Sequence, residues 1–221
     1  MAFDVDDIND ITIDVLKELG NIGSGNAATA LATMISKKVD MAVPQVKILD
    51  FKDVPKILGG EEVPVVGIYF EMSGEIIGNI MFVLSLESGK NLTNILFNKE
   101  NNSMELDEMD ISALSEIGNI LASSYINSLS ALTGLKLTIS VPSLATDMAG
   151  AILSVPAIQY GYIADHVLFI ETQFQEGDKK VTGNLFMIPE IDSFKKLLKS
   201  LGVCWNGSGE SWYGRFKSGS E

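Results

Sequence analysis

Two long segments of the chain place apolar or small residues at helical spacing. On a helical wheel of 100° per residue, one set in residues 14–36 falls on a single side: Leu16, Leu19, Gly23, Ala27, Ala30 and Met34. A second set, in residues 107–133, does the same: Leu114, Ile117, Leu121, Tyr125, Ser128 and Leu132. The pattern predicts two long helices, each with one face against a core.

The opposite faces of these helices carry a repeated set of polar residues. A shift of 98 positions superimposes residues 14–44 on 112–142 without a gap. The matches are Leu16/Leu114, Glu18/Glu116, Gly20/Gly118, Asn21/Asn119, Ile22/Ile120, Leu31/Leu129, Lys38/Lys136, Val43/Val141 and Pro44/Pro142. We call Asp14, Glu18 and Asn21 the first stripe, and Ser112, Glu116 and Asn119 the second stripe. Core packing explains the repeated apolar residues but not the repeated Glu and Asn, so the stripes predict two equivalent sites that face solvent or a partner.

The remaining pattern predicts that each half reads helix, strand, hairpin, helix. In the first half we expect strands at 39–54, 63–72 and 76–86 and a helix at 87–97. In the second half we expect a strand ending near Pro142, a short helix at 145–155 capped by Thr146 or Asp147, strands at 157–163, 166–174 and 180–188, and a helix at 190–201. The segment Gly183-Asn-Leu-Phe186 echoes Gly78-Asn-Ile-Met81. We therefore predict one pseudo-symmetric domain over residues 1–202, with repeats at about 8–98 and 107–202, and a flexible tail at 203–221.

Composition and charge exclude several classes of function. The chain has 46% hydrophobic and 20% charged residues, and it contains no apolar run near the roughly 18 residues that a membrane span needs. Its N-terminal segment is acidic where a signal peptide would be basic, so we expect a soluble, cytoplasmic protein. A net charge of −13 argues against binding to nucleic acid or anionic membranes. The single cysteine, Cys204, excludes a disulfide framework and a cysteine-rich metal site.

Two familiar kinds of chemistry are also disfavoured. The only histidine, His166, begins a predicted strand, and nothing in the sequence places a nucleophile beside it. The run from Gly20 to Asn26 resembles a phosphate-binding loop in composition. However, it lies inside a helical pattern, lacks the Lys-Ser/Thr ending, and is not kept in the second copy. We therefore expect neither a hydrolytic triad nor a nucleotide site.

The repeated Glu and Asn fit one half of a phosphoryl-transfer site. An amide does not titrate near neutral pH, but its carbonyl can hold a water molecule in line with a phosphorus atom. Positioning of this kind is the main contribution of a protein to phosphoryl transfer. A carboxylate repels a phosphoryl group, so the Glu suits a cation of the partner, such as a lysine. The pattern predicts a site completed by a phosphorylated partner.

At this point the motif resembles that of a known family. The pattern Asp/Ser-x3-Glu-x2-Asn-x22-Pro occurs as Asp14/Glu18/Asn21/Pro44 and as Ser112/Glu116/Asn119/Pro142. It is similar to the signature of the CheC/CheX/FliY phosphatases of bacterial chemotaxis, and two copies over residues 8–202 most resemble the CheC branch. The resemblance implies an α+β fold, with two long helices packed on an antiparallel sheet built from both halves. It also implies hydrolysis of the aspartyl-phosphate of the response regulator CheY, which supplies the Mg²⁺, so that this chain needs no cofactor of its own.

The resemblance further implies a second partner and leaves an alternative open. CheC-like proteins bind the deamidase CheD through a helix in their second half, and Asp147-Met148 with Ala151-Ile152 resembles that segment, which suggests Asp147 as a docking residue. The first motif opens with Asp14 and the second with Ser112, so the two sites are expected to differ in strength. The alternative function is a non-catalytic adaptor that binds CheD or a receiver domain and regulates by sequestration.

Overall fold

The computed structural model describes residues 10–99, 103–160, 166–176 and 179–202. The helices are α1 (Asp10–Ile35), α2 (Val54–Ile57), α3 (Leu86–Phe97), α4 (Glu108–Thr133), α5 (Ala149–Tyr160) and α6 (Ile191–Ser200), with a 3₁₀ turn η2 (Phe51–Asp53) before α2. The strands are β1 (Asp40–Asp50), β2 (Pro64–Gly74), β3 (Gly78–Ser85), β4 (Leu137–Ile139), β5 (Ser143–Met148), β6 (His166–Glu176) and β7 (Lys179–Pro189). The predicted tail at 203–221, with Cys204, lies outside the described residues.

The strands of the described chain form one antiparallel sheet in the order β1-β6-β7-β3-β2-β4, and β5 also pairs with β2. The outer strand of each half pairs with the hairpin of the other half, β1 with β6 and β5 with β2. The halves meet at β3 and β7, where Met81 lies opposite Phe186. Met81 and Phe186 are equivalent positions of the two halves, because each is the last residue of one of the two similar segments, 78–81 and 183–186. A pseudo-two-fold relation between the halves places such equivalent positions opposite each other. The predicted α+β class and the sheet built from both halves are confirmed.

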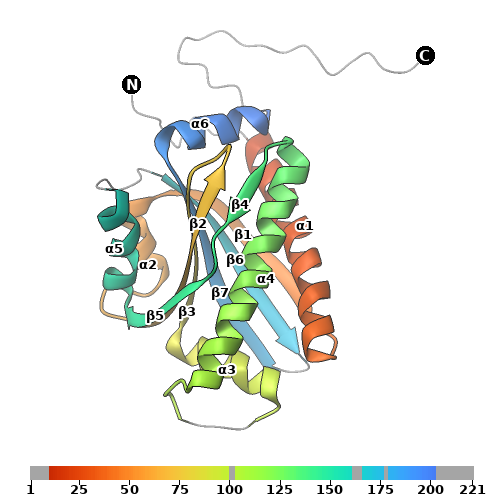
Figure 1. Cartoon of the computed structure of the whole chain (residues 1–221), viewed down its shortest axis with the longest axis vertical. Coiled ribbons are helices and arrows are strands. Elements are labelled where there is room, and N and C mark those ends of the chain that lie inside the picture. The colour runs from red at the N-terminus through yellow and green to blue at the C-terminus, as the bar shows by residue number, and fades with distance from the viewer. Residues whose placement is uncertain (1–9, 100–102, 161–165, 177–178, 203–221) are drawn as a thin grey trace, which may run out of the picture.

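Helices cover both faces of this sheet. Helices α1 and α4 lie side by side on one face, and α2 and α5 lie on the other (Figure 1). Two buried apolar clusters fill these layers, a larger one under α1 and α4 and a smaller one that includes Val54 of α2 and Ile152 of α5. The central strand β3 is buried at every position from Gly78 to Leu84. This double covering explains why β3 reads as an apolar run instead of an alternating pattern.

The two long helices run in opposite directions and touch at a glycine (Figure 1). A Cβ added to Gly23 of α1 would lie 2.4 Å from Cδ1 of Tyr125 in α4, so only a glycine leaves room for the ring. The Tyr125 hydroxyl lies 3.3 Å from Oγ1 of Thr172 in β6, and burial raises the pKa of Tyr125 to about 12. Gly23, which the sequence places on the core face of the helix, therefore permits the close packing of α1 and α4.

The predicted core faces are correct over most of both helices and wrong at their ends. Ala30 and Met34 of α1 and Leu132 of α4 are exposed. Near its end α1 instead buries Leu31 (4% exposed), and Leu31 and Ile35 line a small apolar cavity with residues of α3, α4 and β6. The neighbours of α1 thus change along its length, which a fixed helical wheel does not represent.

The segment after Pro142 differs from its prediction. Residues 143–148 form the strand β5 instead of the start of a helix, and the helix α5 occupies residues 149–160, where part of a strand was expected. β5 pairs with β2 along its length, from Ser143 opposite Tyr69 to Met148 opposite Pro64. Pairing with a strand distant in sequence therefore outweighs the local capping signal of Thr146 and Asp147. The short helix α2 occupies the corresponding place in the first half, for which the sequence suggested no counterpart.

Candidate functional site

The first stripe lies on the outward face of α1. Asp14, Glu18 and Asn21 are all exposed, and Asp14 forms an ion pair with Lys17 at 3.5 Å. The buried residues Leu16 and Leu19 point the other way, into the core. The spacing of three and four residues places Glu18 and Asn21 on adjacent turns of one face. The structure therefore brings together the three residues of the first predicted site.

Pro44 lies beside this stripe at an irregularity of the edge strand β1. The pairing of β1 with β6 shifts between Ala42 and Gln45, so Val43 and Pro44 bulge from the regular ladder. A Cβ on Gly20 would lie 3.0 Å from Cγ1 of Val43, which shows that the bulge packs directly against α1 next to Asn21. Pro44 falls inside the strand predicted at 39–54, where a proline removes one hydrogen bond of the ladder. It lies in an edge strand, but the strand continues past it because the bulge accommodates a residue without an N–H.

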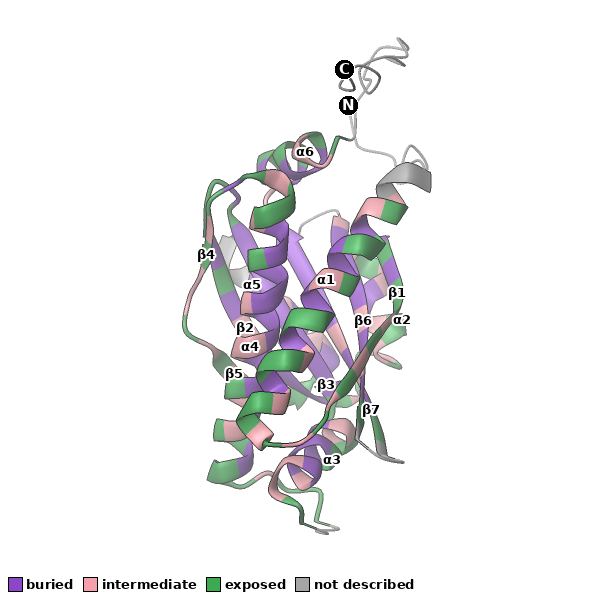
Figure 2. Cartoon of the chain, turned by 90° about the vertical axis from the view of Figure 1, so that its right-hand side faces the viewer, coloured by how far each residue is buried: buried purple, intermediate pink, exposed green. Residues whose placement is uncertain are grey.

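The second stripe occupies the matching face of α4. Ser112 and Glu116 are exposed, whereas Asn119 is half-buried. Ser112 donates a hydrogen bond to the carbonyl of Glu108 at 2.9 Å, so its hydroxyl is held against its own helix. A Cβ on Gly118 would lie 2.9 Å from Ile68 of β2, so α4 lies close to the sheet beside Asn119. Figure 2 shows exposed residues along the outer faces of both α1 and α4.

Pro142 also lies at an irregularity of an edge strand. Ile139 pairs with Met72 and Ser143 pairs with Tyr69, so residues 140–142 face only two residues of β2. Both motif prolines thus follow the same rule: each lies in a bulge at one edge of the sheet, beside the helix that carries its stripe. The two sites are on different helices, α1 and α4.

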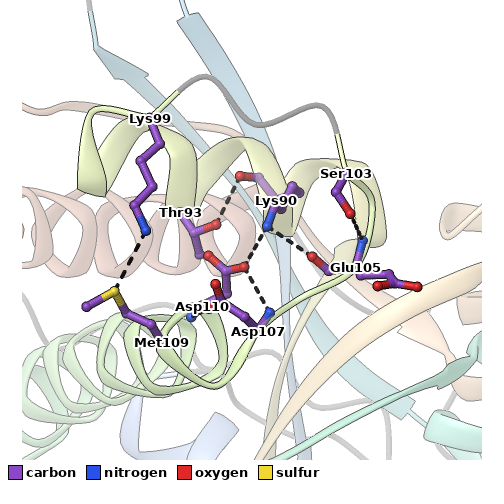
Figure 3. Close-up of polar contacts among 8 residues, drawn as sticks. All are labelled: Lys90, Thr93, Lys99, Ser103, Glu105, Asp107, Met109 and Asp110. Atoms are coloured by element: carbon purple, nitrogen blue, oxygen red, sulfur yellow. Dashed lines mark hydrogen bonds and ion pairs between the residues drawn. The ribbon is translucent and has the colours of Figure 1, made fainter.

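A buried ion pair fixes the beginning of α4, two residues before Ser112 (Figure 3). Lys90 of α3 donates to Asp110 at 2.6 Å and to the carbonyl of Glu105 at 3.0 Å, and the side chains of this pair are only 5% and 6% exposed. Asp110 also accepts from the N–H of Asp107 at 3.1 Å, while Asp107 accepts from the N–H of Asp110 at 2.8 Å. Burial raises the pKa of Asp110, but the hydrogen bonds from Lys90 and Asp107 outweigh it, so the pKa lies below its usual value. Sequence reasoning missed this pair, because its members are 20 residues apart.

Asp147 lies apart from both stripes. It is exposed near the end of β5, five residues beyond Pro142, which is about 17 Å of extended chain. Its carboxylate accepts the N–H of Met148 at 2.7 Å. It therefore belongs to a separate surface at the junction of β5 and α5.

Other kinds of site find little support in the described part of the chain. No group of three or more His, Cys, Asp or Glu side chains gathers there as a metal ion would require. His166 begins β6, with its Nδ1 3.2 Å from a carboxylate oxygen of Asp50 in the neighbouring strand, and its ring packs near Phe194. Among the described residues, no helix combines the length and apolar character needed to cross a bilayer.

Comparison with known proteins agrees with this arrangement. A family model described as CheC-like family matches residues 11–48 and 109–145, which contain the two stripes and their prolines. The CheY-P phosphatase CheC of Bacillus subtilis is 36% identical over 201 residues, which cover 89% of this chain and 96% of that protein. The chain belongs to the CheC-like family. The flagellar motor switch phosphatase FliY of Bacillus subtilis is 28% identical to this CheC-like chain over 141 residues, or 63% of this chain and 36% of that protein.

Solved structures support the fold. FliY of Thermotoga maritima superimposes with a TM-score of 0.70 at 24% identity, covering 88% of this chain and 98% of that one. The middle domain of FliM from H. pylori superimposes with a TM-score of 0.66 at 10% identity, covering 87% of this chain and 99% of that one. At these identities the likeness concerns the architecture of helices and sheet alone.

Proposed function

We propose that this chain hydrolyses the aspartyl-phosphate of a CheY-like receiver domain. The observation that carries the proposal is the duplicated Glu and Asn on outward helix faces, each supported by a proline bulge. The CheC of Bacillus subtilis, named a CheY-P phosphatase, is similar over nearly the whole chain, which supports the same activity here. An exposed helix face suits a substrate that is itself a folded protein, because the receiver covers the site when it docks.

The roles of the residues follow from their chemistry. The side-chain carbonyl of Asn21 or Asn119 accepts a hydrogen bond from the attacking water and aligns it with the phosphorus atom. Glu18 or Glu116 contacts a cation of the receiver through a charge-assisted hydrogen bond. A Mg²⁺ ion held by the receiver would offset charge on the phosphoryl oxygens, and this proposal places no ligand of that ion on the present chain.

Substitution of the asparagines tests the proposal. Loss of a water-positioning contact is expected to cost about 3 kcal/mol, a hundredfold or more in rate, by analogy with removal of one oxyanion-hole donor. Asn21→Ala alone should leave the turnover of the second site, and Asn21→Ala/Asn119→Ala should abolish turnover. Glu18→Ala and Glu116→Ala should mainly raise KM. The measurement is the decay of phosphorylated CheY with catalytic amounts of the chain.

The decisive contrary result is a folded double variant that binds phosphorylated CheY and still dephosphorylates it at the unmodified rate. That result would remove the catalytic role of the asparagines. It would favour the adaptor, which acts only in stoichiometric amounts.

A second binding role is supported by the surface around Asp147. Met148 is 55% exposed at the end of β5, and Ala151 and Val155 are exposed on the following helix α5. A carboxylate next to exposed apolar side chains suits a protein partner, and CheD is the partner that the family resemblance implies. Asp147→Lys should weaken co-purification of CheD without changing phosphatase activity, because Asp147 lies apart from both stripes.

A further inference from the structure

Val141 is the most exposed of the large apolar residues described, with 82% of its surface open to solvent. It lies between β4 and β5 in the bulge that also contains Pro142. Ser140 fixes this bulge on β2: its N–H donates to the carbonyl of Glu71 at 2.9 Å, and its hydroxyl accepts from the N–H of Glu71 at 3.0 Å. The same hydroxyl donates to the carbonyl of Val141 at 2.9 Å. An apolar side chain is therefore presented to solvent on a well-anchored backbone.

The internal repeat provides a matched comparison. Val43 occupies the equivalent position in the first half, but it is half-buried and packs against Gly20. In the second half the equivalent glycine, Gly118, is covered by Ile68 of β2 at 2.9 Å. Val43 fills the space next to the glycine beside the first stripe, whereas Ile68 fills the equivalent space next to the glycine beside the second stripe. Val141 therefore has no such space to fill, and its side chain is exposed to solvent.

Val141 lies close to the second stripe. Ile68, which packs against Gly118, is paired with Leu144 of β5, three residues along the strand from Val141. Asn119 follows Gly118 directly on α4. Figure 1 shows β4 beside α4 and β5 leading away from it toward α5, so the bulge between these strands lies next to α4, whose outward face is where a receiver would dock.

Two positions that are charged in and beside the first stripe are uncharged in and beside the second. The Asp14–Lys17 ion pair of the first stripe is replaced at the equivalent positions by Ser112 and Ser115, which both donate to carbonyls of their own helix. Met109 is 56% exposed and lies three residues before Ser112 on the same face. Apolar side chains therefore lie at both ends of the second stripe.

We infer that Val141 is an apolar docking residue of the second site, which buries its side chain against the receiver domain bound over Glu116 and Asn119. This inference rests on the proposed function and adds a difference between the two sites. A receiver on the second site gains an apolar contact that Val43 does not offer on the first. Val141 touches the surface of the receiver and not the reacting atoms, so it contributes to binding and not to the chemical step.

The test separates the two sites with the asparagine variants. In an Asn21→Ala chain, where only the second site turns over, Val141→Ser should raise the KM for phosphorylated CheY about fivefold to tenfold and leave kcat unchanged, because burial of one valine is lost. In an Asn119→Ala chain, where only the first site turns over, Val141→Ser should change neither constant. Val141→Leu, which keeps an apolar contact, should hold the KM within about twofold.

Ile191→Ser is the matched control. Ile191 is 48% exposed at the start of α6, outside both stripes, so its change should alter neither KM. Two results would overturn the inference. One is an unchanged KM when Val141→Ser is added to the Asn21→Ala chain, and the other is an equal rise of KM in the Asn21→Ala and Asn119→Ala chains. Melting temperatures confirm that each variant is folded.

A binding measurement distinguishes failure of the inference from failure of the proposed function. CheY activated with beryllofluoride is titrated into a Glu18→Ala/Asn21→Ala chain, in which the first site is disabled. A Kd that rises fivefold or more on Val141→Ser supports the docking contact even if neither site proves to be catalytic. An unchanged Kd overturns it.

Discussion

Replacement of Gly23 by alanine tests whether the close approach of α1 and α4 is required for stability. The added Cβ would lie 2.4, 2.7 and 3.1 Å from three ring atoms of Tyr125. The ring cannot move away easily, because Tyr125 is fully buried and its hydroxyl is held near Thr172. Crowding of a packed core typically costs about 1–3 kcal/mol, and the better helix propensity of alanine returns about 1 kcal/mol. We expect Gly23→Ala to lower the free energy of unfolding by up to about 2 kcal/mol.

Gly25 in the same helix is the matched control. No atom lies within 4 Å of a Cβ added there, so Gly25→Ala should raise the free energy of unfolding by about 0.5–1 kcal/mol through helix propensity alone. Urea denaturation followed by circular dichroism measures both variants. Equal stability of the Gly23→Ala and Gly25→Ala chains would refute the packing argument, since propensity would then account for both changes.

Four further predictions concern other properties of the chain. Lys90→Met should cost about 3–5 kcal/mol, because it leaves the Asp110 carboxylate buried without its partner, and Lys90→Met/Asp110→Leu should recover most of that loss. Folding lowers the pKa of Asp110, so its ionised carboxylate stabilises the fold above about pH 4, and this stabilisation is lost on further acidification. Urea titrations at several pH values should therefore show that the free energy of unfolding depends less on acid pH in the double variant. Purified chain without a receiver should hold less than stoichiometric divalent metal by elemental analysis. Removal of residues 203–221 should leave the melting temperature and the phosphatase rate nearly unchanged.

The helices and their outward faces could be predicted because their signals are local. Asp107 and Gly134 bracket the second long helix in the sequence, and the structure uses them as its N-cap and C-cap. The apolar spacing from Leu114 to Ser128 repeats every three or four residues and identifies the buried face directly. Core packing does not explain a Glu and an Asn that are repeated on the opposite face. For this reason the candidate site residues could be identified from the sequence alone.

The strand pairings and the contacts between distant residues could not be predicted in this way. Residues 143–148 carry a helix-capping signal, but their partner strand β2 lies some 80 residues earlier and imposes an extended conformation. Lys90 and Asp110 form an ion pair only because α3 folds back over the start of α4. Val43 and Val141 occupy equivalent positions in the repeat but have different environments, because Val43 packs against Gly20 while Ile68 packs against Gly118. This difference cannot be seen in the sequence, where the two halves match at both the valine and the glycine.

The candidate sites lie on outward helix faces, and none of their residues lines the apolar cavity found in the described part of the chain. The cavity described by the structure lies between α1, α3, α4 and β6, and Leu31, Ile95 and Phe174 are among its lining residues. Gln175 is the one polar residue that lines this cavity, and its other lining side chains offer neither a charge nor a group that could orient water. Under the proposed function, a receiver domain would supply its own phosphorylated carboxylate and metal ion, so its partner would need only a rigid surface with an amide and a carboxylate at fixed spacing. A helix supplies that spacing, the sheet and its edge bulges fix the helix, and exclusion of water is left to the docking of the second protein.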